Sequence, residues 1–525
     1  MKNWKEIEQK MQTLDALQHA MNKILYDMET IAPSGAIPKI GKTLETLSGI
    51  YYYELVDNGL LALIEAEKEA DYLEAISIDA IELDDLSREE KAAGTFFGTT
   101  IEWDMMKELK REIQKISKIP ADSYRAFQEL SIIGHAKWLE AKAANDFAIF
   151  APTLKKIIAY KKQYIEYQGY DQHPYDALLD DYEPGLTVTE LDIFFSGLRE
   201  KIIPFLKKIN ASEKMQAITD KKIGEGFFLQ AKQEEFMVFL AKYIGYDFNR
   251  GQLGISAHPF SQSFSNDDAR ITTRYVEHDI YSSIFSILHE FGHAIYEQNI
   301  AEKLTMTPLG SGISMGIHES QSRFYENMIG RSESFWNPIY PAIQAFFPDS
   351  FADVCLADFI ASINLVEQSF IRVEADELTY PLHIMVRYEI EKKLFSDTLT
   401  VEQLPEAWNT LMMEYLGITP ANVNEGILQD IHWSQGYFGY FPTYALGSAY
   451  SAQFFEAMKR EVDVEKDARD GDFTAITSFL ARNIHQFGKL KTPKELMIDT
   501  TGEAFNPDYY IDYLIEKYST LFLNK

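Results

Sequence analysis

The stretch Tyr281-Ser-Ser-Ile-Phe-Ser-Ile-Leu-His289-Glu290-Phe-Gly-His293-Ala-Ile-Tyr-Glu-Gln-Asn299 combines a helical pattern with a metal-binding pattern. Its apolar residues recur at spacings of three and four, which predicts a helix with one apolar side. Histidines four positions apart lie on one face of a helix, so both imidazoles can reach one metal ion. Glu290 is rotated about 100° from His289 and can face a water molecule instead of the metal.

This His-Glu-x-x-His pattern is the signature of helical zinc peptidases, in which the glutamate is the general base. With 11 histidines in 525 residues, we expect on the order of 0.02 such patterns by chance. A catalytic zinc ion needs a third protein ligand and an open position. The segment Gly316-Ile-His-Glu319-Ser-Gln-Ser-Arg-Phe-Tyr-Glu326 also has a helical pattern. Glu319 is its first candidate for the third ligand, and Glu326 and His318 are the alternatives.

Composition narrows the class of protein. The formal net charge is -30 and 46% of the residues are hydrophobic, so the chain is globular and acidic. An acidic surface argues against a nucleic-acid partner, because phosphates require basic residues. The single cysteine, Cys355, excludes a disulfide within the chain. The N-terminus lacks an apolar signal core, and no apolar run is long enough to span a membrane, so we expect a cytoplasmic protein.

Most of the chain has helical periodicity. The predicted helices of the first half cover residues 4–28, 60–92, 100–146, 152–169, 189–209 and 226–244. Ala269–Val276 is rich in β-branched residues and predicts a strand just before the metal helix, one that can add an extended substrate peptide. No linker or repeat interrupts the chain. We therefore predict a mainly α fold and one domain over residues 1–525.

Several short motifs follow one another along the chain. They are His258-Pro259-Phe260, Asp268-x-Arg270-x-Thr272, His289-Glu-x-x-His293, His318-Glu319-Ser320-Gln321, Ile371-Arg372-x-x-Ala375-Asp376-Glu377 and Gly426-x-x-Gln429-Asp430-x-His432-Trp433. Flanking segments are Tyr26–Thr30, Tyr175–Gly185 and Thr501–Tyr518. In this order the motifs resemble the Taq carboxypeptidase family of metallocarboxypeptidases, from about residue 5 to the C-terminus. Tyr26 replaces a tryptophan of the family pattern, a change remote from the metal chemistry.

The resemblance implies a large two-lobed helical peptidase with a deep active-site groove and a small β-sheet beside the metal helix. Residues 1–250 would form mainly an N-terminal helical lobe, and residues 251–525 the metal-site and substrate-binding region. It implies release of single C-terminal residues from peptides, one zinc ion (or cobalt) per chain, and a homodimer. It also strengthens the assignment of Glu319 as the third metal ligand.

Two further sets of residues are candidates for substrate contacts. The tetrahedral oxyanion needs a donor besides the metal, and by resemblance to other helical zinc peptidases Tyr440 and His432, then Tyr437, supply it. His258 is a further possible donor. An exopeptidase must also bind the free C-terminal carboxylate, for which arginine offers a bidentate grip. Arg372 is the first candidate; its rivals are Arg270, Arg274, Arg323 and Arg387.

The imidazoles that bind a metal need hydrogen-bond acceptors that fix their orientation. Asp268 and Ser322 are the candidates for this role. Rival activities with the same metal site are an oligoendopeptidase and a dipeptidyl carboxypeptidase, which a clamp for a free carboxylate would exclude. A peptide-binding protein without catalysis is a further alternative, and the intact Glu290 argues against it.

Overall fold

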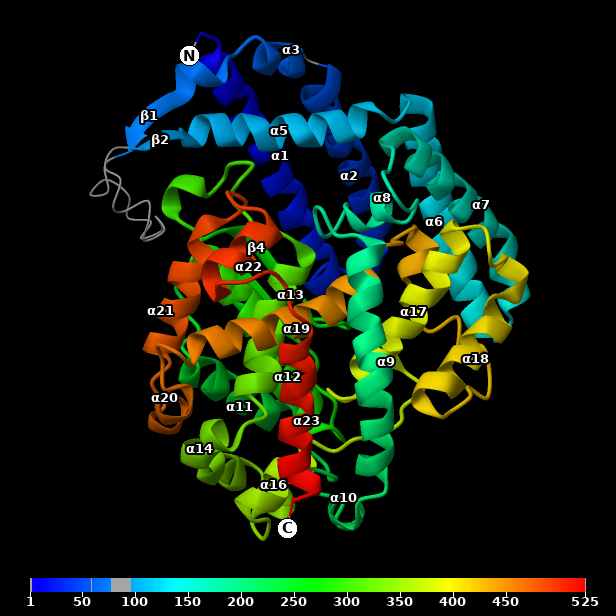
Figure 1. The fold of residues 1–525 in the computed structure, drawn as a ribbon, viewed down its shortest axis with the longest axis vertical. Helices are drawn as coiled ribbons and strands as arrows, with labels where there is room; N and C mark the ends of the chain where they lie inside the picture. Colours follow the sequence, from blue (N-terminus) through cyan, green and yellow to red (C-terminus); the bar gives the residue numbers. More distant parts are fainter. Residues whose placement is uncertain (1, 58, 77–95, 525) are drawn as a thin grey trace. The chain divides into compact units, whose positions relative to one another are not determined.

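The computed structural model describes residues 2–57, 59–76 and 96–524, and helices dominate it (Figure 1). The mainly α class predicted from periodicity is confirmed. In the first half, the predicted helices correspond to α1 (Trp4–Thr30), α5 (Ile101–Ser117), α6 (Ala121–Ala144), α7 (Phe147–Gln168), α9 (Val188–Asn210) and α11 (Gln230–Tyr243). The single helix predicted over residues 100–146 is divided in two before Pro120, because a proline disfavours helical conformation in the residue that precedes it.

The helix predicted over residues 60–92 is wrong in part. In the described residues 60–76, the α-helix α3 (Leu60–Glu65) is followed by a 3-10 helix (Glu69–Tyr72) and then by strand β1 (Leu73–Ile76). This strand pairs in antiparallel fashion with β2 (Phe96–Thr99), so the two strands satisfy each other's backbone hydrogen bonds. Residues 77–92 of the prediction lie outside the described part of the chain.

A three-stranded sheet contains the strand predicted before the metal helix. Its strands are β3 (Leu253–Ile255), β4 (Ser261–Ser265) and β5 (Asp268–Thr273), in the order β3-β5-β4. The predicted strand is β5, which pairs in parallel with β3 and in antiparallel with β4. Both of its edges are therefore occupied. The expectation that this strand adds a substrate peptide is wrong, because no backbone edge of β5 is left for one.

The chain forms two compact units, each assembled from three separate stretches. Unit 1 comprises residues 1–117, 228–313 and 462–500. Unit 2 comprises residues 118–227, 314–461 and 501–525. The prediction of one domain with a lobe boundary near residue 250 stays a prediction.

Unit 1 holds the three-stranded sheet and the helix that follows it, α12 (Ile280–Gln298). Its other helices include α2 (Ile37–Tyr52), α20 (Val464–Asp470), α21 (Thr474–Asn483) and α22 (Pro493–Thr501), whose last residue falls in unit 2. The core of this unit packs α12 against β4, β5 and α11. The sheet and α11 thereby fix the direction of α12.

Unit 2 is built around α19 (Phe441–Met458), which packs along α13 (Met315–Arg323), α17 (Tyr380–Phe395) and α23 (Asp508–Phe522). Its further helices are α8 (Asp176–Leu179), α10 (Glu213–Thr219), α14 (Glu333–Phe346), α15 (Pro348–Phe351), α16 (Leu356–Ser362) and α18 (Leu404–Leu416). Within the described ranges of both units, no helix has the length and apolar character needed to cross a bilayer.

Candidate active site

The helix α12 presents both histidines of the His-Glu-x-x-His pattern on one face. Its N-terminus is capped by Asp279, whose carboxylate accepts a hydrogen bond from the Ser282 backbone N–H at 3.1 Å. The opposite face is buried, and Ile284, Ile287, Leu288 and Phe291 each have 0% exposure. His289 and His293 stay half-buried, with ring centroids 4.9 Å apart. Burial of one helix face thus leaves the imidazoles accessible on the other.

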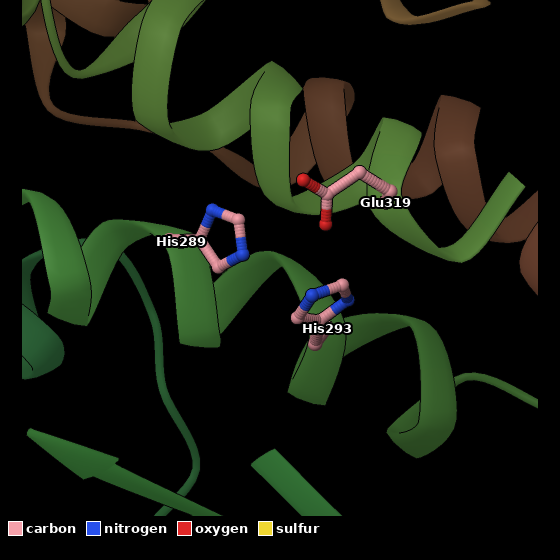
Figure 2. A group of neighbouring side chains, drawn as sticks. All are labelled: His289, His293 and Glu319. Carbon is pink, nitrogen blue, oxygen red and sulfur yellow. The ribbon is translucent and has the colours of Figure 1, made fainter. Parts of the chain in front are cut away.

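The carboxylate of Glu319, on α13, completes a group of three potential metal ligands. One ligand atom from each of His289, His293 and Glu319 lies within 4.8 Å of the other two. Figure 2 shows the two imidazoles rising from one helix towards the Glu319 carboxylate on another. The alternatives Glu326 and His318 are not in this group. Two imidazoles and a carboxylate are the donor set of many catalytic zinc sites, so these residues fit the metal.

Neighbouring side chains hold the Glu319 carboxylate in place. The Ser322 hydroxyl donates to its Oε2 at 3.0 Å, and Nε of Arg323 donates to its Oε1 at 2.8 Å. Glu319 as a whole is 5% exposed. Nη1 of Arg323 also donates a hydrogen bond to Glu326 at 2.9 Å. The carboxylate of Glu326, the alternative ligand, is therefore engaged in an ion pair. A carboxylate with both oxygens already oriented needs little rearrangement to bind a metal.

A glycine of α19 makes room for Glu319, and sequence reasoning missed it. A Cβ atom added at Gly447 would lie 2.4 Å from Cγ of Glu319 and 2.5 Å from its Cβ. Real Cβ atoms do not approach so closely, so only glycine allows this contact. The signal in the sequence is the run of small residues Ala445-Leu-Gly-Ser-Ala-Tyr-Ser-Ala452, which predicts close helix packing without naming the partner.

The general-base candidate, Glu290, is 5% exposed and lies on α12 beside His289. Of the two residues considered for orienting the imidazoles, Ser322 contacts Glu319 instead. Asp268 forms ion pairs with Lys23 and with Arg270, whose Nε lies 2.8 Å from it. The hydrogen bonds found for these two candidates therefore go to other groups.

The predicted oxyanion donors form an aromatic cluster where α19 begins. The ring of Tyr440 lies 5.1 Å from that of Tyr444 and 5.5 Å from that of His432. His432 Nε2 is 3.3 Å from the Tyr444 hydroxyl. Tyr437 is 46% exposed and lies outside this cluster of rings. Two of the three predicted donors, Tyr440 and His432, are thus brought together.

Burial sets the protonation of this cluster. It raises the pKa of Tyr440 to about 12, with the Glu319 carboxylate adding to the effect, so the phenol keeps its proton. Burial also lowers the pKa of His432 to about 3; Asp430 opposes this shift, and the cations Arg372 and Arg387 add to it. The His432 ring is therefore neutral near neutral pH. A neutral imidazole still has one N–H to donate.

The first candidate for the carboxylate clamp, Arg372, is already part of a buried ion cluster. Its Nε and Nη2 donate to Oδ1 of Asp430 at 3.0 and 2.9 Å, and its Nη1 donates to the Tyr380 hydroxyl at 3.0 Å. Arg387 binds the other oxygen of Asp430 through Nε at 2.7 Å. The two guanidinium groups hold the pKa of Asp430 well below its usual range. Two cations share one anion, which leaves this cluster with a formal charge of +1.

The other proposed binding residues have different surroundings. Arg270 is paired with Asp268, and its guanidinium lies 5.1 Å from the centre of the Tyr26 ring. Arg323 is bound to the metal-ligand candidate Glu319. Arg274 and His258 are exposed. Of these three arginines, Arg323 is bound to a candidate metal ligand, Arg270 is paired with another acid, and Arg274 is exposed to solvent.

Known proteins match the chain over nearly its whole length. The model of the carboxypeptidase Taq (M32) metallopeptidase family matches residues 6–518. The chain belongs to this family. It is 35% identical to thermostable carboxypeptidase 1 of Pyrococcus furiosus, over 98% of each chain. It is 48% identical to carboxypeptidase 1 of Bacillus subtilis, over 79% of this chain and 82% of the relative.

Solved structures of the family have the same fold. Trypanosoma cruzi metallocarboxypeptidase 1 superposes with a TM-score of 0.89 at 33% identity, covering 99% of both chains. The M32 carboxypeptidase of Deinococcus radiodurans R1 gives a TM-score of 0.88 at 30% identity, covering all of both chains. The resemblance inferred from the short motifs is confirmed, and the metallocarboxypeptidase class that it implied is supported by these relatives.

Proposed function

We propose that this metallocarboxypeptidase binds one zinc ion through His289, His293 and Glu319 and releases single amino acids from the C-terminus of peptides. The observation that carries the proposal is the convergence of these ligand atoms within 4.8 Å. Two imidazoles and one carboxylate are typical zinc ligands, and cobalt is the alternative metal for such a donor set. A bound ion would polarise the scissile carbonyl and lower the pKa of a water molecule.

Glu290 has the role of general base in this proposal. It precedes the second ligand on the same helix and is rotated away from the two imidazoles, so its carboxylate can accept a proton from the attacking water. It can then deliver that proton to the leaving amine. Its low exposure of 5% keeps bulk water from competing for the carboxylate.

Tyr440 and His432 are the proposed donors to the oxyanion. Both carry a proton that they can donate, because burial keeps the tyrosine un-ionised and the imidazole neutral. The ring contacts among Tyr440, Tyr444 and His432 limit their rotation, which favours a preformed arrangement. Tyr437, at 46% exposure, is the third candidate for this role.

The cluster of Arg372, Arg387 and Asp430 is the proposed site for the substrate's terminal carboxylate. Asp430 compensates one arginine, and the second positive charge is available to attract an anion. The Tyr380 hydroxyl and the rings of Phe441 and Tyr444 surround the Arg372 guanidinium, which fixes its plane. A fixed guanidinium suits recognition of a planar carboxylate. Arg270 and His258 remain the alternative substrate contacts.

The rival activities share the metal ligands but differ in the product released. The family match does not favour an oligoendopeptidase, a dipeptidyl carboxypeptidase or an inactive peptide-binding protein. The homodimer and the cytoplasmic location stay predictions, resting on the resemblance and on the composition.

Mass spectrometry of peptide digests tests this proposal directly. Purified enzyme with its metal content measured should convert a peptide into a ladder shortened one residue at a time from the C-terminus. Release of dipeptides or of internal fragments would contradict single-residue release while leaving the metal site intact. A sample with one zinc per chain that cleaves nothing would contradict the activity itself.

A further inference from the structure

The segment Tyr175–Glu183 of unit 2 has no part in the chemistry described above. It is nevertheless linked to the loop 432–440, which carries the proposed oxyanion donors, and to α13, which carries Glu319. It contains the short helix α8 and precedes α9 (Figure 1). Its first residue, Tyr175, is 0% exposed and its last, Glu183, is 1% exposed. Such burial at both ends of a mostly irregular segment indicates that the segment is fixed in place.

One end of this segment is tied to the loop 432–440, which carries the proposed oxyanion donors. The link is Glu391 of α17. Its Oε2 accepts hydrogen bonds from the Tyr175 hydroxyl at 2.5 Å and from the Gly439 backbone N–H at 2.8 Å. Its Oε1 accepts one from the Trp433 indole N–H at 2.5 Å. One buried carboxylate therefore holds the loop at two points.

The segment and the loop also touch directly. Gly439 has a φ of +90°, and a Cβ atom there would lie 2.4 Å from the Leu178 carbonyl oxygen. The Tyr182 ring packs edge-on against Tyr440 with centroids 5.0 Å apart. No side chain can enter between Gly439 and the segment, so the position of the loop follows that of the segment.

The other end is tied to α13, which carries Glu319. Glu183 Oε2 accepts the Gly316 backbone N–H at 2.9 Å, in the first turn of that helix. The hydroxyl groups of Ser314 and Tyr450 lie near this carboxylate and favour its charged form, against the larger effect of burial, which raises its pKa to about 7. In addition, the Met315 backbone N–H donates to the Tyr182 carbonyl oxygen at 3.0 Å. The carboxylate satisfies an otherwise unpaired N–H of the helix terminus and thereby anchors it.

We propose that Tyr175–Glu183 is a positioning segment that fixes the loop 432–440 relative to α13, with Glu391 and Glu183 as its two anchors. The inference rests on the proposed function, in which the loop supplies oxyanion donors and α13 supplies Glu319. Neither anchor touches the reacting atoms. Each acts through the group it holds, and catalytic groups displaced by about 1 Å lose much of their effect.

The two anchors should give different defects. Glu391→Gln keeps the volume of the side chain, but its amide can accept on one side only. Either the Trp433 indole or the Gly439 N–H then faces an NH₂ group and loses its acceptor. We expect kcat to fall about 10-fold, with KM changed less than about twofold and metal affinity unchanged, because only the donor loop is loosened.

Glu389→Gln is the matched control for this variant. Glu389 lies on the same helix and carries the same charge, but it pairs with Arg199 and Lys392. It should leave kcat unchanged. If Glu391→Gln does not fold, Tyr175→Phe removes one hydroxyl from the same carboxylate and should also lower kcat selectively. Variants of Glu391 and Tyr175 with the kcat of the control would overturn the proposal.

At the other anchor, Glu183→Ala should lower metal affinity about 10-fold, measured by competition with a chromogenic chelator. Glu183→Gln should restore affinity, because its amide oxygen can still accept the hydrogen bond from the Gly316 N–H. If Glu183→Ala does not fold, Tyr450→Phe takes its place and should weaken the metal less. Unchanged affinity in the folded variant would overturn the proposal. A wild-type enzyme that cleaves no peptide would instead contradict the proposed function.

Discussion

The metal helix α12 and the arginine cluster around Asp430 use charged and polar side chains in opposite ways. On α12, His289 and His293 are half-buried, and one face of a single helix presents both. In the cluster, Arg372 is 5% exposed and Arg387 is 0% exposed, and both are bound to Asp430. The two histidines are ready to bind a metal ion, whereas the arginine cluster already has one of its two positive charges compensated by Asp430.

This difference matters because a buried charge requires a partner whether or not it has a function. A short-range pattern such as His-Glu-x-x-His specifies its geometry through the helix itself. The Arg372–Asp430–Arg387 cluster is assembled from distant parts of the sequence, so the charge available to a substrate depends on the sum of all three groups. The predictions below test whether each region acts as this comparison implies.

The largest effect should come from the residue between the two histidines. Glu290→Gln preserves size and the helix, but glutamine cannot take the proton of the attacking water. We expect turnover to fall on the order of 10²-fold or more with the metal content unchanged. Steady-state kinetics and metal analysis on one preparation measure both quantities. Near-normal turnover would exclude Glu290 as the base and weaken the functional reading of α12.

Removing the third ligand should lower the affinity for the metal. Glu319→Ala leaves two imidazoles, and we expect metal affinity to fall at least 10-fold to 100-fold in a chelator titration. Glu326→Ala is the control, since its carboxylate is ion-paired with Arg323 and lies outside the group of three. Equal zinc content in Glu319→Ala and wild type at limiting zinc would reopen Glu326 and His318 as ligands.

The arginine cluster can be tested through the substrate. Amidation of the substrate C-terminus removes a charge and a hydrogen-bonding oxygen, a loss of roughly 1.5–3 kcal/mol. Cleavage should then fall about 10-fold to 100-fold, whereas N-terminal acetylation should have little effect. Arg372→Ala should reduce the ratio of rates for acid and amide, and Arg270→Ala should not. If discrimination persists in Arg372→Ala, another arginine holds the carboxylate.

The last prediction concerns stability and its dependence on pH rather than turnover. His432 has a folded-state pKa of about 3, against an ordinary value of 6.5, because burial disfavours the cation. Its contribution to stability is therefore present above about pH 6.5 and is lost as the pH falls towards 3. His432→Gln should flatten the pH dependence of the unfolding free energy by up to about 1.4 kcal/mol per pH unit in that window. Denaturant unfolding at several pH values measures this slope.

The comparison also explains what could be predicted from the sequence. Helix positions, the pair of histidines and the strand before them depend on residues close in the chain, so local patterns suffice. Glu319 required the family resemblance, since a lone glutamate on a helix has no distinctive spacing. The helix predicted over 60–92 is wrong between Glu65 and Ile76, because pairing of β1 with β2 outweighs helical periodicity there.

Other features depended on contacts that no local pattern reveals. The strand predicted over Ala269–Val276 was expected to bind substrate, but β5 lies in the middle of the sheet because it pairs with both β3 and β4. The sharing of Asp430 by two arginines follows from the packing of distant segments. The motif containing Asp430 was recognised in the sequence, yet its role as a common partner was not.

The contact between Gly447 and Glu319 has a consequence for how relatives of this protein should be judged. The spacing of α13 and α19 is set by a hydrogen atom in place of a side chain. One methyl group at Gly447 would force the helices apart or push Glu319 aside. A descendant carrying that change would retain every ligand and the general base in its sequence, yet have lost its metal. An intact set of ligands is therefore not a sufficient criterion for an active enzyme, and the residue facing the ligand must be checked as well.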